Sequence, residues 1–153
     1  MEIERKFRLS HIPHGIKKDK VVFIRQGYLV CGEVELRIRE KNGKYFMTCK
    51  DGEGFVREEW EREIPSWMFK GLWPSTYGAR IEKNRYVIEY SNSLVFEIDV
   101  FNGFLRGLII LEVEFPNEGV AESFELPVEF KGVEVTNDER YKNKRLAIFG
   151  IPS

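Results

Sequence analysis

The residues at the start of the chain combine two charge types at a spacing that suggests chemistry. Glu2, Glu4 and Lys6 occupy alternate positions, and Ile3 and Phe7 fall on the opposite parity. Alternate side chains of a β-strand point to the same face, so two carboxylates and one amine would project together. Two carboxylates can hold a divalent cation while a neighbouring lysine holds an anion, so this trio suits a complex of a metal ion and a phosphate.

The composition indicates a folded chain with balanced charge. With 153 residues, of which 42% are hydrophobic, residues 1–153 can form a single domain with a buried core. The 24 basic and 25 acidic residues nearly cancel, which argues against a general nucleic-acid or membrane-surface binder but allows a local pocket of charge. The start is unlike a signal peptide and no segment has transmembrane length, so we expect a soluble, cytoplasmic protein.

Alternation of apolar and polar residues dominates the chain and predicts eight strands. We place them at residues 2–9, 22–30, 34–40, 44–50, 56–64, 81–90, 94–101 and 109–115. Helices are expected at 65–73, 117–124 and 137–149, the last begun by a capping box of Thr136 and Glu139. Successive strands joined by short turns predict a mostly β, α+β fold in which the eight antiparallel strands close into a barrel.

Most predicted strands repeat the division of the first, with charged residues on one face and apolar residues on the other. The basic members are Lys6, Arg37, Arg39, Lys50, Arg57, Lys83 and Arg85, and the acidic members are Glu2, Glu4, Glu61, Asp99, Glu112 and Glu114. In one interpretation the charged faces are wetted from outside and the barrel carries a small apolar molecule. In the other they line a tunnel, which requires that the charges pair, bind metal or meet a charged ligand. Periodicity alone leaves both open.

The order of these motifs resembles the CYTH superfamily, also called the triphosphate tunnel metalloenzymes. The resemblance covers essentially the whole chain. It includes the E-x-E-x-K segment at 2–6, the Q-G-Y-L segment at 26–29, the R-x-R segment at 37–39, Lys50, Lys83 with Arg85, the E-x-E segment at 112–114 and the segment 138–144. The compact length and the form of the first two motifs look most like the small prokaryotic inorganic triphosphatases.

The resemblance implies an eight-stranded antiparallel tunnel with charged walls that binds triphosphates together with Mg²⁺ or Mn²⁺. In this interpretation the basic set binds phosphate, joined by Lys142 and Lys144 of the C-terminal helix, and the acidic set binds metal. Glu2, Glu4 and Lys6 would act on the phosphate under attack, with Tyr28 orienting water or a metal ligand.

The expected reaction is cleavage of inorganic tripolyphosphate to pyrophosphate and phosphate. One alternative is another enzyme of the same fold, such as a class IV adenylate cyclase or a nucleoside or thiamine triphosphatase. Another is a non-catalytic module that binds polyphosphate. The expected partner is the small-molecule triphosphate itself, with no nucleic acid and no membrane, and the sequence leaves monomer or homodimer open.

Overall fold

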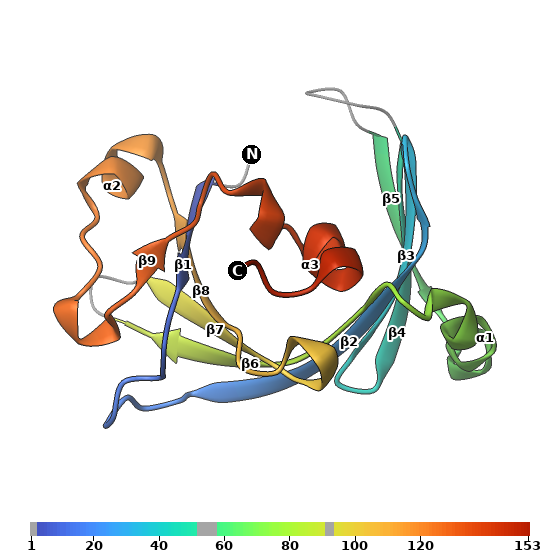
Figure 1. The fold of residues 1–153 in the computed structure, drawn as a ribbon, viewed down its shortest axis with the longest axis horizontal. Coiled ribbons are helices and arrows are strands. Elements are labelled where there is room, and N and C mark those ends of the chain that lie inside the picture. The colour runs from blue at the N-terminus through green and yellow to red at the C-terminus, as the bar shows by residue number, and fades with distance from the viewer. Residues whose placement is uncertain (1–2, 52–57, 91–93) are drawn as a thin grey trace.

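The computed structural model describes residues 3–51, 58–90 and 94–153, which form one strongly curved sheet with helices on both sides (Figure 1). The strand order is β5-β4-β3-β2-β6-β7-β8-β1-β9, and every neighbouring pair is antiparallel. The strands are β1 (Ile3–Arg8), β2 (Lys20–Cys31), β3 (Val34–Lys41), β4 (Lys44–Asp51), β5 (Glu58–Ile64), β6 (Arg80–Glu89), β7 (Val95–Phe101), β8 (Ile109–Phe115) and β9 (Val133–Glu134).

The helices are short. They are α1 (Ser66–Leu72), α2 (Glu118–Ser123) and α3 (Asn143–Phe149), accompanied by 3-10 turns at Trp73–Thr76, Gly103–Leu105, Val128–Phe130 and Glu139–Tyr141. No helix in the described part of the chain has the length and apolar character needed to cross a membrane.

The prediction of a mostly β, antiparallel fold is confirmed, whereas closure into an eight-stranded barrel is not seen. All eight predicted strands are present, a ninth, β9, adds to β1, and β5 and β9 are the two edges of the sheet. Among the described residues no strand pairing joins these edges, so the sheet forms an open trough. After the two residues of β9 the chain turns into the trough, where α3 lies between the two walls (Figure 1).

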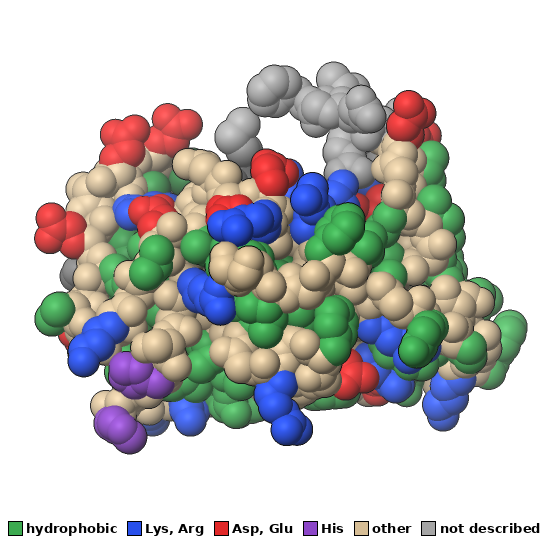
Figure 2. Space-filling model, viewed as in Figure 1, with side chains coloured by type: hydrophobic (Ala, Val, Ile, Leu, Met, Phe, Trp, Pro, Cys, Tyr) green, Lys and Arg blue, Asp and Glu red, His purple; other side chains and the backbone are tan. Residues whose placement is uncertain are grey.

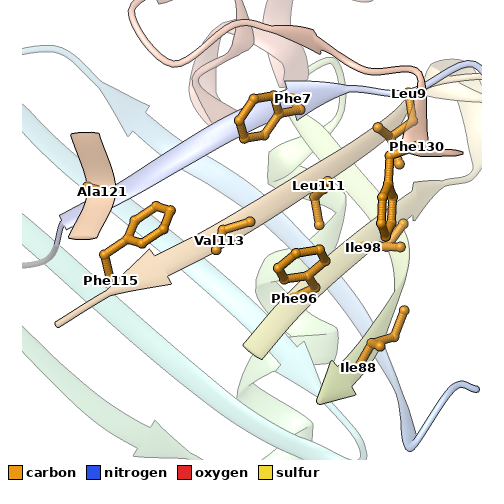
Figure 3. Packing of buried hydrophobic residues seen from close by; sticks show 10 residues of the cluster. All are labelled: Phe7, Leu9, Ile88, Phe96, Ile98, Leu111, Val113, Phe115, Ala121 and Phe130. Carbon is orange, nitrogen blue, oxygen red and sulfur yellow. The ribbon is translucent and has the colours of Figure 1, made fainter. Parts of the chain in front are cut away.

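The apolar faces of β1, β7 and β8 are on the outside of the trough. Phe7, Phe96, Leu111 and Val113 pack there with Phe130, in a cluster that also includes Ala121 of α2 (Figure 3). On the other half of the sheet Phe69 of α1 is fully buried and contacts Tyr45 of β4, with 5.0 Å between ring centroids. Helices α1 and α2 therefore cover the apolar face from outside, and the charged face is the concave one.

Helix α3 closes part of the concave face. Leu146 and Ala147 are buried in a second apolar cluster with Tyr28, Ile81 and Ile110 of the sheet. The charged residues of the concave face thus share the trough with an apolar contact that fixes α3.

The predicted capping box does not form. Helix α3 begins at Asn143 rather than Asn137, because Asp138 instead caps the 3-10 turn by accepting a hydrogen bond from the Arg140 amide. The Thr136 hydroxyl accepts a hydrogen bond from the Lys6 amide at 3.0 Å and donates one to Glu134 at 2.6 Å. Thr136 therefore stabilises the pairing of the C-terminal segment with β1. Gly150, with φ of 82°, ends α3.

Candidate active site

The pairing of β1 with β8 brings acidic and basic side chains of the E-x-E-x-K and E-x-E motifs together. Lys6 lies opposite Glu112, with 3.7 Å between Nζ and Oε1, and Glu4 lies opposite Glu114. The side chains of Lys6 and Glu112 are both mostly buried, at 19% and 17% exposure. The register of two strands far apart in the sequence thus assembles the carboxylate-and-amine group that the first six residues suggested.

A buried ion-pair network joins β6 to β7. Asp99 accepts hydrogen bonds from Lys83 Nζ at 2.8 Å and from Arg85 Nε and Nη2 at 2.8 and 3.0 Å. Burial tends to raise the pKa of Asp99, but the two cations outweigh burial and hold that pKa below its usual value. Burial lowers the pKa of Lys83, against the opposing effect of Asp99. Both side chains are only 2% exposed, so neither charge is offset by bulk water.

Two arginines of β3 have unsatisfied donors. The Nε atoms of Arg37 and Arg39 are buried and have no hydrogen-bond partner within the described part of the chain. Arg37 and Arg39 are alternate residues of one strand, and burial together with the charge of Arg37 lowers the pKa of Arg39. Arg39 has one weak contact, 3.5 Å from Nη2 to Glu61 Oε1. A buried N–H donor without a partner is costly, and an anion would satisfy it.

Tyr28 of β2 lies opposite Arg37 in the strand register. Burial raises the pKa of its hydroxyl, and the charge of Arg37 opposes that rise. Gln26 Nε2 donates a long hydrogen bond, 3.4 Å, to the same hydroxyl. Tyr28 therefore stays neutral at physiological pH, and its hydroxyl can donate a hydrogen bond to an anion bound beside Arg37.

A cavity of about 260 Å³ opens beside these residues. Its wall consists of Lys6, Tyr28, Glu35, Arg37, Lys50, Lys142, Asn143 and Lys144, which amounts to five cations and one carboxylate. A smaller cavity of about 170 Å³ adjoins it and shares Lys6 and Lys142, with Glu4 on its wall. In the space-filling view basic and acidic side chains lie close together in the upper middle of the molecule (Figure 2). The larger cavity suits a compact polyanion.

The two lysines of the C-terminal segment reach this cavity from the side opposite the sheet. Lys142 immediately precedes α3 and also pairs with Glu139 at 2.9 Å, and Lys144 lies 3.9 Å from Glu35. Lys50 is opposite Glu35 in the β3–β4 register. Glu35 is thus a buried carboxylate among cations, which partly balances a site that would otherwise repel itself.

The predicted metal ligands are brought together only in part. Among the described residues no three acidic, histidine or cysteine side chains lie close enough to form a ready-made metal site. Glu61 accepts a hydrogen bond from Thr48 at 2.9 Å and lies on the opposite wall, while Asp99 is taken up by Lys83 and Arg85. Glu2 and Arg57 lie outside the described residues.

The carboxylates still fit a hard divalent cation. Glu4 faces Glu114 and Glu97 faces Glu112, so carboxylates gather on one face of the sheet, where Lys6 lies 3.7 Å from Glu112 and Arg85 lies 3.3 Å from Glu97. Mg²⁺ is usually held by one or two carboxylates together with waters and substrate phosphates rather than by a complete protein cage. The chemistry of these donors therefore matches Mg²⁺ or Mn²⁺ bound together with a phosphate ligand.

Sequence reasoning missed two residues that shape the site. Glu97 lies opposite Glu112 and 3.3 Å from Arg85 Nη1. Arg8, which continues the alternation of Glu4 and Lys6, donates hydrogen bonds to the Tyr141 hydroxyl at 2.7 Å and the Pro152 carbonyl at 3.1 Å. Alternation could have placed both on the charged face, but their partners depend on strand register and on the fold of the C-terminus.

Comparison with known proteins gives matches along nearly the whole chain. Residues 1–142 match the family model described as the CYTH domain. An inorganic triphosphatase of Nitrosomonas europaea is 45% identical over 149 residues, covering 96% of this chain and 97% of that protein. An inorganic triphosphatase of Acetivibrio thermocellus is 35% identical over 148 residues, covering 95% and 92%. The solved structure of the inorganic triphosphatase NE1496 is similar with a TM-score of 0.84 at 44% identity, covering 100% and 97%.

Proposed function

Since the chain belongs to the CYTH family, we propose that it is a divalent-metal-dependent inorganic triphosphatase that hydrolyses tripolyphosphate to pyrophosphate and phosphate. Two full-length relatives named inorganic triphosphatase support this activity. The structural observation that carries the proposal is the pair of buried, unsatisfied Nε atoms of Arg37 and Arg39, next to a cavity with five cations and one carboxylate.

The basic residues of the trough bind the phosphate chain. Arg37 and Arg39 offer forked donors from the sheet, and the lysines Lys6, Lys50, Lys142 and Lys144 offer point charges around the cavity. Lys83 and Arg85 add charge from the floor of the trough, and Arg57 belongs to the same proposed set. With the sheet below and the segment around Lys142 and Lys144 above, the open trough encloses the substrate as a tunnel.

The acidic residues hold the metal. Glu4, Glu112 and Glu114 supply oxygen donors from β1 and β8, and Glu2 and Glu61 complete the proposed set. When bound, Mg²⁺ or Mn²⁺ would neutralise charge on the phosphate oxygens and would make water acidic enough to attack at neutral pH.

The residues next to the acidic group orient the substrate and stabilise the negative charge of its phosphate oxygens. Lys6, held by Glu112 at 3.7 Å, donates to an oxygen of the phosphoryl group under attack. Tyr28, kept neutral by burial, donates a hydrogen bond near Arg37 and orients water or a phosphate oxygen. The leaving pyrophosphate carries its negative charge next to Arg37 and Arg39. The guanidinium groups stabilise that charge, so the pyrophosphate can leave without taking up a proton.

The lining of the larger cavity also favours an unsubstituted triphosphate. Apart from Tyr28 and Asn143, its side chains are charged, and five of the six charged groups are cations. Recognition of a base or a thiazole ring needs directed hydrogen-bond partners or a stacking aromatic face. The cavity therefore selects for phosphate oxygens rather than for an organic group.

Arg39→Ala tests the observation that carries the proposal. Removal of the Arg39 guanidinium should raise the KM for tripolyphosphate far more than it lowers kcat, because it removes a binding contact and leaves the metal ligands intact. Arg106→Ala, on an exposed turn, is the matched control and should leave both constants unchanged. Unchanged kinetics in Arg39→Ala would contradict the assignment of the β3 arginines as phosphate ligands.

A further inference from the structure

The carboxylate of Asp99 is enclosed by cationic donors rather than open to a metal ion and its waters. It is 1% exposed, and each of its oxygens accepts at least one charge-assisted hydrogen bond. Oδ1 accepts from Arg85 Nε at 2.8 Å, and Oδ2 accepts from Lys83 Nζ at 2.8 Å and Arg85 Nη2 at 3.0 Å. A magnesium ligand needs an oxygen facing a space that waters and phosphate oxygens can share.

The surroundings of Asp99 also differ from those of the other carboxylates. Strand register places Ile110 opposite Asp99, and Ile24 and Phe101 on either side of Lys83, all of them buried. The acidic pairs Glu4–Glu114 and Glu97–Glu112 lie further along the same strands. Asp99 therefore belongs to an apolar floor that contains its own counter-ions, and the acidic pairs belong to the metal region.

Arg85 connects this floor to the phosphate-binding arginines. Asp99 uses Nε and Nη2 of Arg85, and Nη1 remains on the side of Glu97 at 3.3 Å. Arg85 lies opposite Val22 of β2 and Arg39 lies opposite Gln26 of the same strand, so both side chains project from the same face of the sheet. The charge of Arg85 also helps to lower the pKa of Arg39. Without a fixed counter-charge, a third arginine beside Arg37 and Arg39 would be repelled from the position that binds phosphate.

We propose that Asp99 is a positioning residue that holds Lys83 and Arg85 in place for phosphate binding, and that it is not a metal ligand. This inference rests on the proposed function, because it names how one acidic residue of the same site works. The forked contact fixes the plane of the Arg85 guanidinium. Nη1, which lies 3.3 Å from Glu97, is therefore held in one position, and less side-chain freedom is lost when an anion binds there. The carboxylate also gives the buried Lys83 amine a partner in an apolar layer.

Simple electrostatics and positioning predict opposite effects when the charge of Asp99 is removed. If Asp99 only repelled the anion, Asp99→Asn would tighten binding of tripolyphosphate. If Asp99 positions Arg85, the same variant should weaken binding by about tenfold or more, because a charge-assisted forked contact that orders a ligand group is lost. Calorimetric titration of tripolyphosphate in the presence of a chelator measures this without metal or turnover.

A double-mutant cycle identifies the residue through which Asp99 acts. Arg85→Ala and Asp99→Asn should each weaken tripolyphosphate binding, and the double variant should bind about as weakly as Arg85→Ala alone, because Asp99 has nothing left to position. Asp19→Asn is the control, since Asp19 is exposed, accepts a hydrogen bond from the Glu89 amide and does not line the cavity. Independent, additive losses would overturn the positioning role.

Direct titration with Mn²⁺ tests whether Asp99 is a metal ligand. Asp99→Asn should bind Mn²⁺ within about threefold of the wild type, whereas Glu112→Gln should bind at least about tenfold more weakly. A loss of Mn²⁺ affinity in Asp99→Asn as large as in Glu112→Gln would overturn the inference. Wild-type protein that binds tripolyphosphate but does not hydrolyse it would contradict the proposed function alone, and both titrations would still decide the role of Asp99.

A second variant separates the loss of a metal ligand from misfolding of the protein. Asp99→Asn leaves a buried ammonium unpaired, whereas Lys83→Met combined with Asp99→Asn removes both charges and can be close to neutral for folding. Circular dichroism reports whether each variant folds. The folded double variant should keep wild-type affinity for Mn²⁺, and loss of that affinity would show that Asp99 ligates metal after all.

Discussion

Glu4 and Glu114 lie directly opposite each other across the antiparallel pairing of β1 and β8. Carboxylates in this relationship repel, and the next carboxylate pair, Glu97 and Glu112, repeats it across β7 and β8. Lys6, 3.7 Å from Glu112, and Arg85, 3.3 Å from Glu97, offset negative charge in this group. The concave face therefore concentrates negative charge along β8 and positive charge along β3, which is the arrangement that a metal–polyphosphate complex neutralises.

Removal of one carboxylate from this group should impair turnover without unfolding the protein. Glu4→Gln and Glu112→Gln keep the shape of the side chain and remove its charge, so each should lower kcat by roughly 10²-fold or more at limiting Mg²⁺. Glu122→Gln, on the exposed side of α2, is the control. Phosphate release measured over a Mg²⁺ series would contradict the assignment if both variants kept near-normal turnover at the lowest concentrations.

Ligand binding should stabilise the fold through the same charges. A ligand that binds only the folded state at about 100 times its Kd adds about 2.7 kcal/mol to the free energy of unfolding. Tripolyphosphate with Mg²⁺ should therefore raise Tm more than inorganic phosphate with Mg²⁺ does. An equal rise in Tm with a neutral apolar ligand would instead favour a carrier of hydrophobic molecules.

Acid should weaken the attachment of the C-terminal segment to β1. Arg5 of β1 donates two hydrogen bonds to Glu134 of β9, at 2.8 and 2.7 Å, and these lower the pKa of Glu134 from its ordinary value of 4.5. Because the pKa in the folded state is lower than in the unfolded state, the stabilisation is fully present above pH 4.5. It is lost as the pH falls through the lowered pKa.

Glu134→Gln should consequently lower the free energy of unfolding at pH 7 by no more than about 1 kcal/mol, since the pair is partly exposed. The difference from the wild type should shrink as the pH falls below 4.5, because the wild type then loses the same ion pair. Chemical denaturation at a series of pH values gives the measurement. A difference that stays constant down to pH 2 would show that the hydrogen bonds rather than the charge of Glu134 stabilise the segment.

The alternation of residues in the sequence was enough to predict which residues share the charged face, but not whether that face is the concave one. Glu4, Lys6, Arg37 and Arg39 share a face because strands have a period of two residues. Which face is concave depends on where α1, α2 and the segment around Phe130 pack, and those contacts join distant parts of the chain. The resemblance to a known family, rather than the periodicity, favoured the charged interior.

Strand register explains the predictions that the structure corrects. Thr136 has the local sequence of a helix cap, but its hydroxyl bonds to the amide of Lys6, a partner 130 residues away. Glu97 and Asp99 have the same periodicity, yet pairing with β8 places Glu97 opposite Glu112 and Asp99 opposite Ile110. A single sequence contains no signal for such pairings, because they depend on how strands far apart in the chain align.

The central claim concerns the substrate, and a comparison of kcat/KM tests it most directly. Tripolyphosphate, ATP and thiamine triphosphate should be assayed with Mg²⁺ and with Mn²⁺, with phosphate, pyrophosphate and cyclic nucleotide measured as products. The account predicts that tripolyphosphate has the highest kcat/KM, that its products are pyrophosphate and phosphate, and that a chelator abolishes the reaction. A higher kcat/KM for ATP, or formation of cyclic AMP with pyrophosphate, would contradict it.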